Sequence, residues 1–212
     1  TASAAKLLVK EAEQSGILDQ FPGVDGIVPI VHGAGCCIGT NDEAFRKLQR
    51  AIWGYATHPN FASVLMLGLG CESNQIPAML EAYGRQQDDA FQYFTLQSEG
   101  GTRKSIEKGM IWLETALKTA NKAVREPVDV SHLSVALQCG GSDGYSGITS
   151  NPALGHAVDL LVKNGGTAAL AETPEIYGAE NLLTNRATSP EVARKLIDLL
   201  EWWEKYTLKH GS

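Results

Sequence analysis

The chain has 212 residues and a net charge of −6; 43% of the residues are hydrophobic and 20% are charged, which suits one large globular domain or two small ones. No run of Lys and Arg exceeds two residues, which argues against a nucleic-acid groove, and no apolar stretch reaches the ~18 residues that a membrane span needs. The N-terminus lacks the residue order of a signal peptide and the four cysteines are irregularly spaced, so we expect a cytoplasmic protein without a disulfide framework.

Five apolar runs are predicted to be β-strands. Their near-continuous hydrophobicity is typical of strands that are covered on both faces, as in parallel sheets. In chain order the runs are 24–31 (VDGIVPIV), 62–69 (ASVLMLGL), 91–97 (FQYFTLQ), 133–138 (LSVALQ) and 166–171 (GTAALA).

Three further stretches carry apolar residues at helical spacing, which predicts amphipathic helices. The stripes are Phe45, Leu48, Ile52 and Tyr55; Ile106, Met110, Leu113 and Leu117; and Val192, Leu196, Leu199 and Trp203. Helix start signals accompany them. Thr40 with Glu43 is spaced as a capping box, and the pairs Asn151-Pro152 and Ser189-Pro190 each place a capping residue before a first-turn proline.

This alternation of strands and helices predicts an α/β fold with mainly parallel sheet flanked by helices. The polar, proline-interrupted stretch 121–131 is the expected internal boundary. We therefore divide the chain into residues 1–125 and residues 126–212.

A weak repeat relates the two parts. Glu72 and Ile76 recur one hundred positions later as Glu172 and Ile176, and each pair follows a predicted strand. A strand that runs into a loop rich in Gly and Cys precedes each of them, HGAGCC in one part and QCGGSDGYSG in the other. The repeat favours two similar, Rossmann-like halves.

The loops after parallel strands open on one edge of the sheet, where ligands bind in such folds. In this chain those loops hold an unusual set of polar residues. The set is His32, Cys36, Cys71, Glu72, Asn74, Gln75, Gln97, Glu99, Gln138, Cys139, Ser142, Asp143, Glu172 and Glu175. Carboxamides, carboxylates, thiols and an imidazole with few cations suit a polyhydroxylated substrate and a metal ion better than a nucleotide. Thiolate with imidazole selects a transition metal over magnesium.

Each of these residues also has a purely structural interpretation. A cysteine outside a disulfide is more often a small buried hydrophobic residue than a ligand. The carboxylates of Glu72 and Glu172 can cap the helices that follow them. The adjacent pair Cys36-Cys37 lacks the CxxC spacing of a redox site, and GGSDG matches no phosphate-loop pattern. A functional site is favoured because all of these residue types are predicted at the same edge of the sheet.

Five segments stand out together: HGAGC (32–36), LGLGCESNQ (67–75), QCGGSDGYSGITSNPALG (138–155), GGTAALAETPEIYGAE (165–180) and KLIDLLEWWEKY (195–206). They resemble the altronate and galactarate dehydratase family of sugar-acid hydro-lyases. The resemblance covers nearly the whole chain and implies an α/β fold in which residues 1–125 are the second domain of the family. It aligns Cys36, Cys71 and Cys139 with cysteines of the family pattern, and it assigns no role to Cys37.

The resemblance implies part of a metal-dependent lyase that dehydrates a sugar acid of the altronate or galactarate type to a 2-keto-3-deoxy acid. The implied cofactor is Fe²⁺ or Mn²⁺. Only the central part of such enzymes is matched, so we expect their small N-terminal domain and C-terminal region to be partners of this chain, in a protein that can form homo-oligomers. Two alternatives stay open: the large subunit of a sulfolactate sulfo-lyase, and a non-catalytic substrate-binding or assembly domain.

Dehydration next to a carboxylate needs a base on the α-carbon, an acid for the departing hydroxide and stabilisation of the developing negative charge. We predict that His32 and Glu72 are the base and the acid, in either order. Cys36, Cys71 and Cys139 are predicted to bind the metal, as ligands of one ion or of an iron–sulfur cluster with one open iron. The predicted substrate-binding residues are Asn74, Gln75, Gln138, Ser142 and Asp143.

Overall fold

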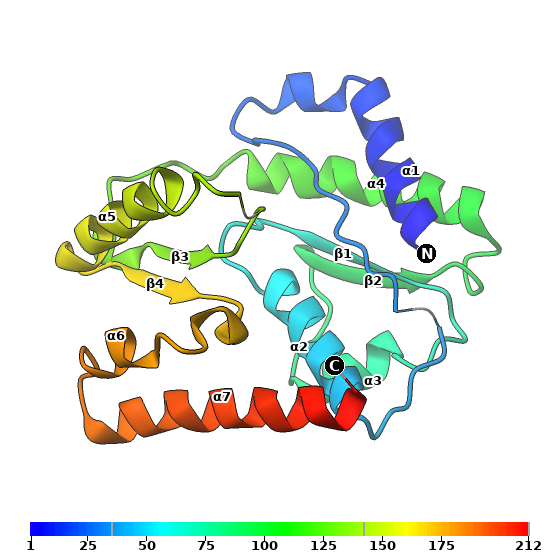
Figure 1. Ribbon diagram of the computed structural model, residues 1–212. Coiled ribbons are helices and arrows are strands. Elements are labelled where there is room, and N and C mark those ends of the chain that lie inside the picture. Colours follow the sequence, from blue (N-terminus) through cyan, green and yellow to red (C-terminus); the bar gives the residue numbers. More distant parts are fainter. Residues whose placement is uncertain (35, 142, 212) are drawn as a thin grey trace. The chain divides into compact units, whose positions relative to one another are not determined.

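The computed structural model describes residues 1–34, 36–141 and 143–211, and the chain divides into two compact units, Thr1–Arg125 and Glu126–Ser212 (Figure 1). Each unit contains two parallel strands that follow one another in the chain with a helix between them. This confirms the predicted α/β fold with parallel strands flanked by helices. In the described ranges, no helix combines the length and apolar character that a membrane crossing requires.

The described residues of the first unit form five helical segments and one pair of strands. In chain order these are α1 (Ala2–Gln14), η1 (Ile17–Gln20), α2 (Glu43–Ala56), β1 (Val64–Gly68), α3 (Ile76–Ala82), β2 (Phe91–Thr95) and α4 (Thr102–Ala120). The register of β1 with β2 runs from Val64 opposite Phe91 to Gly68 opposite Thr95. The turn after β1 and the turn after β2 therefore lie at the same edge.

One core cluster of this unit joins α1 to α4. Ala12 of α1 and Phe21, just after η1, pack with Leu113 and Leu117 of α4. The helices approach closely because position 109 of α4 is glycine: a Cβ there would stand 3.0 Å from the methyl carbons of Leu8. A second cluster, of Ile76, Leu80 and Phe91, packs α3 against β2.

The second unit contains the other pair of strands and the long C-terminal helix. Its elements are η2 (Val130–His132), β3 (Ser134–Leu137), α5 (Ser150–Lys163), β4 (Thr167–Leu170), η3 (Thr173–Ile176), α6 (Glu180–Thr184) and α7 (Pro190–His210). The register of β3 with β4 runs from Ser134 opposite Thr167 to Leu137 opposite Leu170. The loop that begins at Gln138 and the loop that begins at Ala171 therefore leave the same edge of the sheet.

The helix cap predicted at Ser189 is confirmed. Its hydroxyl accepts a hydrogen bond from the backbone N–H of Val192 at 3.3 Å, and Pro190 is the first residue of α7. Ser189→Ala should lower the free energy of unfolding by about 1 kcal/mol, because an N-terminal N–H of the helix loses its acceptor. Urea denaturation of the 212-residue chain measures this. Ser189→Asp restores an acceptor and should stay close to the wild type; equal losses in both variants would contradict the capping role.

The strand predicted at 24–31 is wrong, since the structure contains no strand there. Pro29, in the middle of the run, has no N–H to donate to a ladder. The segment is attached to the end of α4 instead: the Gly23 N–H donates to the Asn121 side chain at 2.7 Å, and Arg125 pairs with Asp25 at 2.5 Å. Val28 is 65% exposed, so the hydrophobic run does not mark a buried strand.

Two predicted helix starts are also displaced. α2 begins after Asp42 rather than Thr40, and Glu43 pairs forward with Lys47 at 2.9 Å instead of closing a capping box. The hydrogen bond from Lys47 lowers the pKa of Glu43. α5 begins at Ser150 with Thr149 as its N-cap residue, so the predicted cap Asn151 lies inside the helix, while Pro152 lies in the first turn as predicted.

The loss of the first predicted strand changes the comparison of the two units. Glu72 follows the first strand of its pair, β1, whereas Glu172 follows the second strand of its pair, β4. The two positions of the repeat are therefore not equivalent in the order of elements. The strands were also predicted to be covered on both faces. Among the described residues of β3 and β4 only Leu137 is buried, because a sheet of two strands has little covered area.

Candidate functional site

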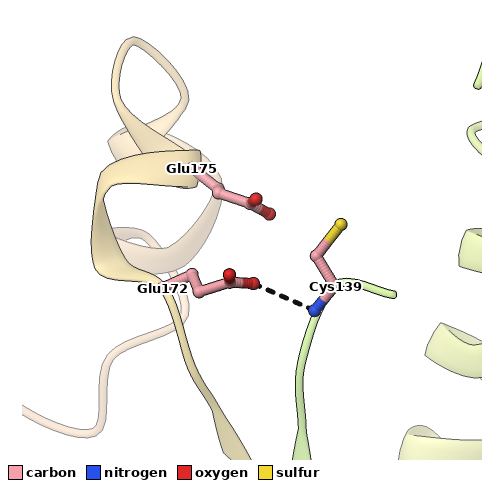
Figure 2. Close-up of side chains that lie close together, drawn as sticks. All are labelled: Cys139, Glu172 and Glu175. Carbon is pink, nitrogen blue, oxygen red and sulfur yellow. Dashed lines mark hydrogen bonds between the residues drawn. The ribbon is translucent and has the colours of Figure 1, made fainter. Parts of the chain in front are cut away.

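Three side chains with metal-ligating atoms converge at the edge of the second unit where β3 and β4 both end. Cys139 stands two residues after β3, Glu172 stands two residues after β4, and Glu175 lies in η3. One ligand atom from each, the Cys139 sulfur and an oxygen of each carboxylate, lies within 4.8 Å of the other two. Figure 2 shows the thiol and the two carboxylates facing one another.

The backbone around Glu172 holds this arrangement. The N–H of Cys139 donates to Oε2 of Glu172 at 2.9 Å, which links the loops that follow β3 and β4 (Figure 2). The carbonyl of Glu172 accepts from the N–H of Glu175 at 2.9 Å and so begins η3. Glu172 has a φ of 64°, and no other non-glycine residue in the described ranges has a positive φ. This left-handed conformation is costly for a residue with a side chain, so the surrounding contacts must maintain it.

The charge of this cluster comes from its two carboxylates. All three residues are exposed, and across the described ranges no Lys or Arg forms an ion pair with Glu172 or Glu175. Two carboxylates this close repel each other when both are ionised. The chemistry of the donor set, one sulfur and two carboxylates, fits a divalent transition metal.

A second group of predicted residues gathers in the first unit. The N–H of Ser73 donates to the Cys36 carbonyl at 2.8 Å, which joins the HGAGCC loop to the loop after β1. The amide of Gln97, after β2, donates to the Cys71 sulfur at 3.4 Å. The structure therefore brings together the loops that carry Cys36 and Cys71. Cys139 belongs to the other unit, so the three-cysteine metal site stays a prediction.

Glu72 is half-buried in the turn after β1. Its Oε1 accepts from the Leu69 N–H at 2.9 Å and its Oε2 accepts from the Gly70 N–H at 2.6 Å. The two bonds fix the turn and hold the carboxylate against the end of the strand. The sequence left two interpretations of Glu72 open: a cap of the following helix, or an acid or base in catalysis. In the structure its carboxylate accepts hydrogen bonds from the turn that precedes it.

His32 is exposed, and its Nδ1 accepts a hydrogen bond from the Ala34 N–H at 3.3 Å. The hydrogen bond made by one ring nitrogen sets the protonation of the other. In the neutral ring, therefore, Nε2 carries the hydrogen.

The predicted substrate-binding residues fall into both units. Asn74 Oδ1 accepts from Gln49 Nε2 at 3.0 Å, and Gln75 Nε2 donates to the Glu72 carbonyl at 2.6 Å. Asp143 Oδ1 accepts from the N–H groups of Tyr145 and Ser146 ahead of α5. Gln138 is exposed at the end of β3, and Ser142 lies outside the described residues.

Sequence reasoning placed Glu172 and Glu175 among the loop residues but left both out of the predicted metal site. The available signal was their position: both follow the predicted strand 166–171, as Cys139 follows 133–138. Two parallel neighbouring strands end at the same edge. That geometry would have paired them with Cys139.

Family comparisons cover both units. The family model described as D-galactarate dehydratase/altronate hydrolase, second domain, matches residues 1–121, and the model described as D-galactarate/altronate dehydratase, C-terminal, matches residues 130–212. The chain belongs to the galactarate/altronate dehydratase family. This confirms the family that the sequence motifs indicated.

Individual relatives carry related names. The chain is 35% identical over 210 residues to altronate dehydratase of Bacillus subtilis, an alignment that covers 99% of this chain and 40% of that protein. It is 37% identical over 163 residues to galactarate dehydratase (L-threo-forming) of Escherichia coli, covering 74% of this chain and 31% of that protein. It is 27% identical over 164 residues to (2R)-sulfolactate sulfo-lyase subunit beta of Chromohalobacter salexigens, covering 77% and 41%. The chain thus spans well under half the length of these relatives.

Proposed function

We propose that this chain is part of a hydro-lyase that dehydrates a sugar acid of the altronate or galactarate type to a 2-keto-3-deoxy acid. The observation that carries the proposal is the pair of family matches, which cover residues 1–121 and 130–212, together with relatives named altronate and galactarate dehydratase. The reaction removes the proton α to the substrate carboxylate and expels the β-hydroxyl as water. The resulting enol then becomes the keto acid.

Glu72 is our candidate for the base. Its carboxylate oxygens each accept one backbone N–H, which leaves further lone pairs for the α-proton. The same two bonds hold the carboxylate in one orientation, as a catalytic base requires.

His32 is our candidate for the acid. The acid form is the imidazolium ring, whose two nitrogens both carry hydrogen, so the hydrogen bond from the Ala34 N–H to Nδ1 must be given up when the ring is protonated. Nε2 of the protonated ring can then give its proton to the departing hydroxide and leave a neutral imidazole. Glu72 as base and His32 as acid is one of the two orders that the sequence left open, and it is proposed on the geometry of Glu72.

The proposed substrate-binding residues retain free polar atoms for hydroxyl groups. In the described part of the chain, the hydrogen bonds of Asn74, Gln75 and Asp143 leave Asn74 Nδ2, Gln75 Oε1 and Asp143 Oδ2 without a partner. These atoms include both donors and acceptors, which matches the dual character of a sugar hydroxyl. Gln138 and Ser142 are proposed for the same role on residue type.

A divalent Fe²⁺ or Mn²⁺ ion would stabilise the negative charge that develops on the substrate carboxylate as the α-proton leaves. The chain offers two candidate ligand sets for it. One is the predicted set of Cys36, Cys71 and Cys139, which could also hold an iron–sulfur cluster. The other is Cys139 with Glu172 and Glu175.

A dehydration assay of the full-length protein tests the proposal. Altronate, galactarate and (2R)-sulfolactate are each supplied with and without Fe²⁺ under reducing conditions, and keto-acid formation and sulfite release are measured. We expect keto acid from one of the sugar acids. Sulfite release from sulfolactate alone would favour the sulfo-lyase alternative, which the 27% identical relative supports. Binding of a sugar acid without turnover would favour the non-catalytic alternative.

A further inference from the structure

We propose that Cys139, Glu172 and Glu175 form a site for one first-row transition metal ion that lies wholly within the second unit. The proposal deepens the proposed function, on which it rests for the role of the metal in turnover. It replaces the three-cysteine ligand set with one that needs a single cysteine.

The distances are close to those of a formed site. Metal bonds to sulfur and oxygen in such sites are ~2.0–2.3 Å, so two ligands of one ion lie no more than about 4.6 Å apart. The ligand atoms of Cys139, Glu172 and Glu175 already lie within 4.8 Å of one another. Small side-chain rotations would bring all three onto one ion.

The ligands come from a scaffold that fixes their relative positions. Cys139 and Glu172 follow strands that are paired in register up to Leu137 opposite Leu170, and the Cys139 N–H donates directly to Glu172. Glu175 is held one turn further on by its N–H bond to the Glu172 carbonyl. The three side chains are therefore brought together by the backbone of β3, β4 and η3 (Figure 2).

Charge is the second argument. Glu172 and Glu175 bring two carboxylates together beside the Cys139 sulfur. In the described ranges no Lys or Arg forms an ion pair with either glutamate. A divalent cation bound between the two carboxylates would offset their negative charge.

The ligand types select the ion. Magnesium and calcium prefer oxygen ligands alone, whereas one thiolate shifts preference toward Fe²⁺, Co²⁺ or Zn²⁺ and two carboxylates remain compatible with Mn²⁺. Three protein ligands leave coordination positions open, as in catalytic rather than structural sites. The open positions suit a ligand with a carboxylate and a neighbouring hydroxyl.

Titration of the metal-free 212-residue chain with Co²⁺ tests the site, because a thiolate bound to Co²⁺ gives a near-ultraviolet charge-transfer band. We expect one Co²⁺ per chain and a band in the wild type. Cys139→Ser should abolish the band, and Glu172→Gln and Glu175→Gln should each weaken Co²⁺ binding at least about tenfold. Circular dichroism and urea denaturation establish that each variant is folded.

The matched controls are Cys36→Ser, Cys71→Ser and Glu204→Gln, the last at an exposed position of α7. All three should bind Co²⁺ as the wild type does. Loss of the band in Cys36→Ser or Cys71→Ser would overturn the proposal in favour of the three-cysteine set, and so would wild-type binding in a folded Cys139→Ser. The two proposals can fail separately. If Co²⁺ binds with the expected variant pattern but the full-length protein dehydrates no sugar acid, the proposed function is refuted and the metal site is supported.

Discussion

Glu72→Gln in the full-length protein is expected to lower the turnover of sugar-acid dehydration by about 10²- to 10⁴-fold, the usual contribution of a positioned acid or base. Glutamine has nearly the same shape but cannot accept the α-proton. The wild-type carboxylate accepts one N–H with each oxygen, from Leu69 and Gly70. The amide keeps one of these acceptors, so the variant should fold with a modestly lowered melting temperature.

Turnover measured on the folded variant separates catalysis from turn stability. If Glu72 is the base, the variant should lose turnover even at temperatures well below its melting point, where the protein is folded. Glu81→Gln, at an exposed position of α3, is the matched control and should retain full turnover. A Glu72→Gln protein that keeps its turnover but melts earlier would show that Glu72 only stabilises the turn.

Phe91→Ala should reduce the free energy of unfolding of the first unit by about 3–5 kcal/mol, the range for truncating a buried aromatic side chain. Phe91 is 3% exposed and packs with Ile76 and Leu80. Its ring also lies 6.2 Å from that of Trp53 and 5.2 Å from the guanidinium of Arg85, so truncation removes both of these contacts. Denaturation of the 212-residue chain, followed by Trp fluorescence, measures the loss.

Ile111→Ala provides the comparison. Ile111 is an apolar residue of α4 that is 72% exposed, and its truncation should change stability by no more than about 0.5 kcal/mol. Similar losses in both variants would mean that the cluster around Phe91 is not a core of the first unit.

The sequence was sufficient for features that depend on near neighbours in the chain. The apolar stripes at Phe45, Ile106 and Val192 predicted α2, α4 and α7, because helical hydrogen bonds join residues only four positions apart. The cap at Ser189 is equally local. The motifs that resemble the family also required only the order of residues, and the family matches confirm that interpretation.

The tertiary structure decided what depends on distant partners. The run 24–31 is as apolar as the true strands, yet a strand exists only where another chain segment supplies its ladder, and there an ion pair and a side-chain bond to the end of α4 hold the segment instead. Cys139 and Glu172 are 33 positions apart in sequence and meet only because β3 and β4 pair in parallel and end together. Residue type, the position of each cysteine in a loop and the family resemblance together suggested a metal site of three cysteines. The pairing of two strands placed one cysteine beside two glutamates, since the register of a sheet determines which side chains at its edge come within reach of one ion.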